Sequence, residues 1–337
     1  MNQDALFDDG FVAPDATASR IAAAPFPPGL HALGGQMPET LYLGTSSWSY
    51  PGWEGLVYAG HASENQLAQH GLPAYASHPL FRSASLDRNF YAPLPLSEYQ
   101  RYAAQAPEGF RFLIKAPNQV TDAVKRGAGG VPTELNADFL NATLATEEFV
   151  LPCIEGLGEK AGPLVFQFSP MPPEMLADAP AFVERLDTFL QALPPLPASE
   201  GMEAPFYAVE FRDPSLVTPR MMKMLAARDV RYCVALHSRM PAAVRQLQAV
   251  AATGPGPLVI RWSLNAKLKF TEAETRYKPF DQLKDEDLAT REALVEAVLD
   301  TLENDLPVWL IVGNNAEGCA PLTLHKLARG LAEVLPG

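Results

Sequence analysis

The chain has few cysteines, few histidines and no long run of apolar residues. Its 337 residues include 3 cysteines and 6 histidines. The cysteines, Cys153, Cys233 and Cys319, are far apart and odd in number, so they form neither a disulfide framework nor a metal-binding pattern, and a cytoplasmic protein is expected. No run reaches the ~18 consecutive apolar residues of a membrane span. The acidic N-terminus also differs from a secretory signal, so we expect no membrane partner.

Positive charge is scarce as well. The sequence has 26 Lys and Arg against 39 Asp and Glu, a net charge of −13. Because contacts to nucleic-acid phosphates need clustered Lys and Arg, we expect no extensive nucleic-acid surface. No dinucleotide-binding glycine fingerprint and no glycine-rich phosphate loop with lysine occurs, so no cofactor is expected. A small local basic site is still compatible with this composition.

The most informative stretch runs from residue 207 to 214. Val209 and Phe211 are predicted to face one side of an extended strand, while Glu210 and Arg212 face the other side with Ala208. The Asp-Pro pair that follows ends the strand, because proline cannot continue a β-ladder. An apolar outer face with charged groups on the inner face indicates a closed barrel that is covered by helices and carries a site at one end.

Eight strand-like segments alternate with helix-like segments. Besides 207–214, the strands are predicted at 41–48, 81–91, 110–117, 164–170, 231–238, 258–263 and 308–315. Helices are predicted at 97–106, 136–151, 179–193, 219–228, 241–252, 287–304 and 321–335. This alternation predicts an α/β fold, a single (β/α)8 TIM-type barrel over residues 40–337. A doubly wound open sheet is the competing interpretation, but it would need near-continuous apolar central strands.

Residues 1–39 are rich in Ala, Pro and Gly, show no sustained periodicity and are predicted to be a flexible, disordered tail. Gln3, Leu6 and Phe7 in this tail form a Gln-x-x-Leu-Phe peptide. It is similar to the peptides by which bacterial replication and repair proteins dock on the sliding clamp, although a pattern this short also occurs by chance. The peptide suggests an alternative function, a non-enzymatic accessory protein of DNA repair or replication that is recruited by the sliding clamp.

Five motifs together are similar to those of a known family; they are residues 44–53, 90–91, 110–117, 163–168 and 208–215. On these motifs the chain resembles the YecE-like family, also called domain of unknown function 72, from about residue 40 to residue 330. The resemblance implies a TIM-type barrel of uncharacterised activity. The family's second strand usually carries Val-Glu-x-Asn, and Ala84, Ser85 and Asp87 occupy the matching positions here. The seventh strand often ends Arg-x-His-Gly, and residues 261–264 read Arg-Trp-Ser-Leu, so a glutamate–histidine pair for acid/base work is missing.

The inward positions at the C-terminal ends of barrel strands lie around one mouth, where barrel enzymes place their sites. The catalytic candidates are Glu210, Lys115 and His237, and the substrate-binding candidates are Trp48, Asp87, Tyr91, Gln167, Arg212, Arg261, Asn314 and Asn315. If the protein is an enzyme, Glu210 is expected to act as general acid/base, Lys115 or Arg261 to hold developing negative charge, and His237 to be a secondary proton carrier. Such a site predicts a metal-independent isomerase, lyase or hydrolase, and replacing Glu210 by Gln should abolish activity while leaving the fold.

These residues also have structural interpretations. Glu210 and Arg261 could form a buried ion pair that only fixes the barrel interior, His237 could simply bond to a neighbour, and the aromatic side chains could pack as a lid. Three cations, Lys115, Arg212 and Arg261, are nevertheless more than a neutral packing network needs. This excess favours a small anionic ligand, a phosphorylated or acidic sugar-like compound.

Metal chemistry is disfavoured, because His237 is the one histidine at a predicted strand end. A single Mg²⁺ held by Asp87 or Glu210 with waters is the alternative.

Overall fold

Eight parallel strands form a closed barrel, in the order β1-β10-β9-β8-β7-β6-β3-β2. The computed structural model describes residues 21–127, 131–197 and 204–335. The barrel strands are β1 (Leu41–Thr45), β2 (Ser83–Leu86), β3 (Arg111–Lys115), β6 (Ala161–Phe168), β7 (Tyr207–Phe211), β8 (Arg231–Leu236), β9 (Leu258–Trp262) and β10 (Val308–Val312). The predicted TIM-type α/β barrel is confirmed, and the open sheet is excluded because β1 pairs with both β2 and β10.

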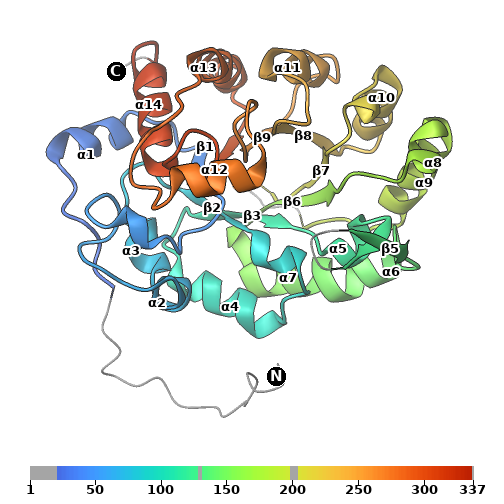
Figure 1. Ribbon diagram of the computed structural model, residues 1–337, viewed down its shortest axis with the longest axis horizontal. Coiled ribbons are helices and arrows are strands. Elements are labelled where there is room, and N and C mark those ends of the chain that lie inside the picture. Colours follow the sequence, from blue (N-terminus) through green and yellow to red (C-terminus); the bar gives the residue numbers. More distant parts are fainter. Residues whose placement is uncertain (1–20, 128–130, 198–203, 336–337) are drawn as a thin grey trace.

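Helices surround the strands on all sides in Figure 1. They are α1 (Pro28–Gly35), α2 (Glu64–His70), α3 (Leu72–Ala76), α4 (Leu96–Gln105), α5 (Asn118–Thr121), α6 (Ala142–Ala145), α7 (Leu151–Leu157), α8 (Pro173–Ala177), α9 (Ala179–Ala192), α10 (Pro219–Ala227), α11 (Ala243–Ala251), α12 (Phe270–Tyr277), α13 (Leu288–Leu302) and α14 (Ala320–Ala332). A π-helical turn, η4 (Thr146–Val150), joins α6 to α7, so the helix predicted at 136–151 is two helices with a later end. Among the described helices, none is both long and apolar enough to cross a membrane.

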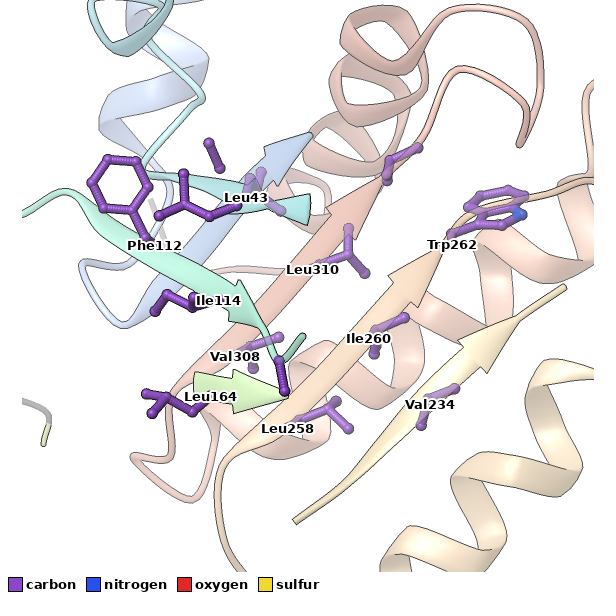
Figure 2. Packing of buried hydrophobic residues seen from close by; sticks show 14 of the residues in the cluster. Leu43, Phe112, Ile114, Leu164, Val234, Leu258, Ile260, Trp262, Val308 and Leu310 are labelled. Atoms are coloured by element: carbon purple, nitrogen blue, oxygen red, sulfur yellow. The ribbon is translucent and has the colours of Figure 1, made fainter. Parts of the chain in front are cut away.

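Alternating side chains divide the apolar core into two clusters. Val209 and Phe211 belong to the larger cluster between strands and helices. Figure 2 shows members of this cluster, such as Ile260 and Leu310, on neighbouring strands. Ala208 instead belongs to a smaller cluster inside the barrel, with its counterparts on other strands: Tyr42, Leu113, Val165, Cys233, Val259, Trp309 and Ile311. The predicted orientation of the 207–214 stretch is therefore confirmed, and the next inward residue on β7 is Glu210.

The strands end earlier than predicted. The segment at 81–91 contains only the four residues of β2, and the short helical turn η2 (Asp87–Phe90) follows it. Likewise β1 and β10 end at residues 45 and 312, and β7 ends at Phe211. Beyond these points the side chains follow loops rather than the strand alternation, so the period-two assignment fails for Trp48 after β1, although Asp87 and Arg212, each one residue past a strand end, still join the charged cluster.

Part of the predicted tail is folded. Helix α1 begins at Pro28, where a first helical turn tolerates proline, and Leu33 and Met37 are buried in the larger core cluster. The prediction of an unstructured segment up to residue 39 is therefore wrong for residues 28–35. Gln3, Leu6 and Phe7 lie outside the described residues.

The predicted rim loops contain further elements. Helices α2 and α3 lie within 49–79, and the two-stranded antiparallel hairpin of β4 (Val124–Arg126) and β5 (Pro132–Leu135) lies within 118–135. A reciprocal capping box between Ser63 and Gln66 begins α2. The hydroxyl of Tyr75 on α3 accepts a hydrogen bond from the backbone N of Thr45 and donates one to the carbonyl of Ser83. This side chain ties β1 to β2 and thereby helps to position the residues that follow both strands.

Candidate functional site

The charged side chains predicted to converge do meet at the C-terminal mouth. Arg261 of β9 donates from Nη1 to Oε2 of Glu210 on β7, at 2.8 Å. Its Nη2 donates to both carboxylate oxygens of Asp87, at 2.8 and 2.6 Å. The side chain of Glu210 is 0% exposed and that of Arg261 is 4% exposed, whereas that of Asp87 is 31% exposed. The network therefore runs from the closed interior of the barrel, at Glu210, towards solvent, at Asp87.

Arg212 is the second guanidinium on Glu210. Its Nη2 lies 2.5 Å from Oε1 of Glu210 and donates to Oε1 of Gln167 on β6 at 3.3 Å. Oε1 of Glu210 accepts no hydrogen bond in the described part of the chain, so this contact is an ion pair. The other amino group, Nη1, is buried and has no hydrogen-bond acceptor in the described part of the chain. A buried N–H group without an acceptor costs free energy, so Arg212 presents a donor that a ligand could satisfy.

Burial and charge act in opposite directions on the pKa of Glu210. Burial alone would raise it, but the positive charges of Arg212 and Arg261, together with the hydrogen bond from Arg261, lower it to about 2. The carboxylate therefore stays ionised at neutral pH. A proton acceptor with so low a pKa is poorly matched to acid/base work near pH 7, and both of its oxygens already face a guanidinium.

Lys115, at the end of β3, differs from both arginines. Its side chain is 8% exposed, yet none of the carboxylates in residues 21–127, 131–197 and 204–335 lies within ion-pair distance of its Nζ. The contact that the ammonium makes is with the ring of Phe90, whose centroid lies 3.5 Å away. Burial is the main cause that lowers the pKa of Lys115 to about 8, and Asp87 and Glu210 oppose this shift from a distance.

The turn η2 holds Phe90 over Lys115. The side chain of Asn89 donates to the backbone carbonyl of Lys115 at 2.8 Å and accepts from the backbone N of Leu94 at 2.9 Å. Asn89 thereby ties the turn to β3 and to the segment that precedes α4. Phe90 was not among the predicted site residues. The Phe-Tyr pair at 90–91 is the sequence feature that points to this position, but the prediction names Tyr91 rather than Phe90.

Two further acids near the cluster have other partners. Asp122 lies 3.6 Å from Nε of Arg126, and burial raises the pKa of this carboxyl group. Asp213, next to Arg212 in the chain, accepts a hydrogen bond from the backbone N of Met171 at 2.8 Å. Neither acid forms an ion pair with Lys115.

His237 is half-buried near the cluster. Burial, followed by the positive charge of Arg212, lowers the pKa of its imidazole to about 4. Its Nδ1 accepts a hydrogen bond from the backbone N of Arg239 at 3.2 Å. A neutral imidazole that bonds to a neighbouring residue fits a structural role for His237 better than the role of a proton carrier.

The predicted aromatic site residues form no hydrogen bond with the charged cluster around Glu210 and Arg261. Trp48 is buried in the larger core cluster, donates from Nε1 to the carbonyl of Leu67 at 3.1 Å and packs edge-on against Tyr102 of α4. Trp53 is also fully buried. Tyr91 is 79% exposed and contacts Phe90. The lid-packing interpretation therefore describes Trp48, and of the two predicted aromatic site residues Tyr91 is the exposed one.

The two asparagines after β10 organise the loop before α14. Oδ1 of Asn314 accepts from the backbone N of Ala320 at 2.8 Å and from Nε1 of Trp53 at 3.3 Å. The backbone carbonyl of Asn315 accepts from the backbone N of Asn265 at 2.8 Å. These contacts are structural, and none of them reaches the charged cluster.

Tyr50 is a residue that the strand pattern could not indicate, because it follows β1 in a loop. Burial raises the pKa of its hydroxyl, a hydrogen bond with Ser46 opposes this, and the negative charge of Asp87 adds to it. Within the described residues, no group of three or more His, Cys, Asp and Glu is close enough to hold a metal ion.

Comparison with known proteins gives a family and a fold. A family model described as "Protein of unknown function DUF72" matches residues 42–336. The crystal structure of a DUF72 family protein from Enterococcus faecalis is similar, with 20% identity and a TM-score of 0.56 over 86% of this chain and 95% of that chain. One from Thermotoga maritima has 18% identity and a TM-score of 0.55 over 86% of this chain and 98% of that chain. At these identities the similarity to the two structures establishes the fold alone. No curated protein matches the chain.

Proposed function

The chain belongs to the DUF72 family of proteins of unknown function, and from this premise we propose that it binds a small organic anion at the C-terminal mouth of its barrel. The compound is phosphorylated or acidic and sugar-like. The observation that carries the proposal is Lys115, a buried ammonium group that has no carboxylate partner within ion-pair distance in the described part of the chain.

The charges around Lys115 support an anion rather than a cation or a neutral ligand. Glu210 and Asp87 are paired with Arg212 and Arg261, which leaves the ammonium group of Lys115 without an ion-pair partner among the described residues. Because burying an unpaired charge is costly, the positive charge left over favours a bound phosphate or carboxylate. The unpaired Nη1 group of Arg212 adds a planar donor of the kind that these anions prefer.

The groups at the rim suit a hydroxylated ligand. Asp87 keeps part of its carboxylate exposed, and its negative charge helps to raise the pKa of the Tyr50 hydroxyl. Carboxylate and hydroxyl groups can exchange hydrogen bonds with the hydroxyl groups of a sugar. Tyr91 offers an exposed ring face beside them.

If the bound compound is also converted, Lys115 is better suited than Glu210 to move a proton. A group with a pKa of about 8 changes its protonation state near neutral pH, where general acids and bases work best. Glu210 would then hold the two guanidinium groups in place. The reaction class stays that of a metal-independent isomerase, lyase or hydrolase.

The first test is binding of ribose 5-phosphate and gluconate, measured by isothermal titration calorimetry. Replacing Lys115 by Met should weaken binding of either compound by about 10- to 100-fold, the effect of losing one charge-assisted hydrogen bond. Lys326→Met is the matched control, because Lys326 is exposed on α14, and its affinity should equal that of the wild type. Equal affinities in the Lys115→Met variant and the wild type, or no binding of either compound, would remove the proposal.

The affinity for gluconate should also depend on pH. Its carboxylate stays ionised between pH 6 and 10, so the change must come from the protein. Because Lys115 has a pKa of about 8 in the free protein, the affinity should be constant below pH 8 and fall by up to about 10-fold per pH unit above it. The Lys115→Met variant should show no such fall. A wild-type profile that is flat up to pH 10 would contradict the role of Lys115.

A further inference from the structure

A second unpaired cation lies at the other end of the barrel, beside a cavity. The cavity has a volume of about 450 Å³ and lies between α11 and α13, next to the first residues of β8 and β9. Apolar side chains in its lining include Leu247 and Val250 of α11 and Ala297 of α13. They alternate with polar side chains, which are Arg231, Gln248, Glu296, Asp300, Thr301 and Asn304. Cavities of roughly 300–1,000 Å³ with apolar walls and a few polar groups are typical of small-molecule sites.

Arg231, the first residue of β8, is the one cationic side chain among the described residues that line this cavity. It is 8% exposed, and its Nε donates to the carbonyl of Pro257 at 3.0 Å. None of the described carboxylates lies within ion-pair distance of its guanidinium. The absence of a side chain at Gly256 lets the guanidinium lie against the loop before β9, since a Cβ atom there would come within 2.4 Å of Nη1.

Burial disfavours the charged form of this guanidinium, and little nearby negative charge offsets that effect. Burial lowers the pKa of Arg231, and the exposed Asp229 is the one charge that opposes it. Arginine does not lose its proton in proteins, so the guanidinium stays charged where it lines the cavity. A buried charge without a partner is unfavourable, and the carboxylate of a ligand would supply the missing partner in a bidentate geometry.

We propose that this cavity binds a small monocarboxylic acid with an apolar body. The carboxylate would pair with Arg231, and the apolar body would lie between Leu247 and Ala297. Glu296 and Asp300 are exposed on the α13 side of the cavity. Their charges oppose any ligand carboxylate that does not pair with Arg231, so a ligand with a single negative group is favoured. The compound therefore differs in class from the hydroxylated anion proposed for the mouth, and this site does not depend on that proposal.

Octanoate is a suitable probe, with octan-1-ol as its uncharged counterpart, and the full-length protein is titrated with each by calorimetry. Octanoate should bind saturably and at least about 10-fold more tightly than octan-1-ol, because one charge-assisted pair is worth roughly 1.5–3 kcal/mol. Equal affinities for the two probes, or no saturable binding of octanoate, would overturn the proposal without any variant.

Two variants locate the bound octanoate. Arg231→Met removes the cation, and Leu247→Trp fills the cavity while leaving Arg231 in place, so either one should reduce octanoate affinity by about 10-fold or more. Lys326→Met should leave octanoate affinity unchanged, because Lys326 is exposed on α14 and does not line the cavity. Unchanged affinity in both Arg231→Met and Leu247→Trp would refute the site.

Discussion

Replacing Glu210 by Gln is expected to destabilise the protein by about 3–5 kcal/mol at pH 7, because it leaves two guanidinium groups buried without their shared counter-charge. Glu210 is fully buried and contacts both Arg212 and Arg261. Urea unfolding followed by circular dichroism measures the change. Glu184→Gln is the matched control, since that carboxylate is 75% exposed in its pair with Arg220, and it should change stability by less than about 1 kcal/mol.

The pH dependence of this difference follows from the lowered pKa. The carboxylate of Glu210 has a pKa of about 2 in the folded protein, against 4.5 for the ordinary group. Its contribution to stability is therefore complete above pH 4.5 and is lost as the pH falls towards 2. If the Glu210→Gln variant is as stable as the wild type at pH 7, the view that Glu210 anchors the two arginines is wrong.

This expectation differs from the one drawn from the sequence, in which Glu210→Gln removes activity and leaves the fold intact. The strand pattern identified Glu210 as an inward charged residue, but it could not reveal that two guanidinium groups bind the same carboxylate. With both contacts known, loss of activity in Glu210→Gln would not by itself distinguish a catalytic role from a structural one. A catalytic assignment therefore needs the stability of the variant beside its activity.

Replacing Lys115 by Met is expected to stabilise the protein at pH 7 by about 1–3 kcal/mol while weakening anion binding. The pKa of Lys115 is lowered from 10.5 to about 8, and each pKa unit corresponds to about 1.36 kcal/mol of cost in holding the charged form. Methionine keeps an unbranched apolar side chain against Phe90 but carries no charge. Stabilisation with loss of function is the pattern expected where a binding site stores an unfavourable charge. Urea unfolding at pH 7 measures the gain, and a loss of stability would contradict it.

The barrel and its charged interior could be predicted because both follow from strand periodicity. In a closed parallel barrel every strand has a helix-facing side and an interior side, so the alternation in β7 was enough to direct Glu210 inward. The same rule placed Lys115 and Arg261 at one end. Their convergence depends only on strand parity and on the end of the strand at which each residue lies.

The rest of the site depends on chain segments without such a period. Trp48 lies three residues beyond the end of β1, where the loop turns its ring outward against α4. Phe90 lies in a helical turn, and its position over Lys115 is set by the hydrogen bonds of Asn89. Helix α1 was missed because its short apolar pattern is stabilised by tertiary packing of Leu33 rather than by local periodicity.

The central claim is that Lys115 carries a buried charge that lacks an ion-pair partner in the free protein. It can be tested without any ligand by measuring the unfolding free energies of the wild type and Lys115→Met from pH 7 to 10.5 and comparing them. The unfolded chain binds more protons than the folded one between the two pKa values of Lys115, about 8 and 10.5, so the wild type should gain stability over this range. The advantage of Lys115→Met should therefore be largest at pH 7 and disappear by pH 10.5. A difference that is independent of pH, or a variant that is less stable than the wild type at pH 7, would contradict the account.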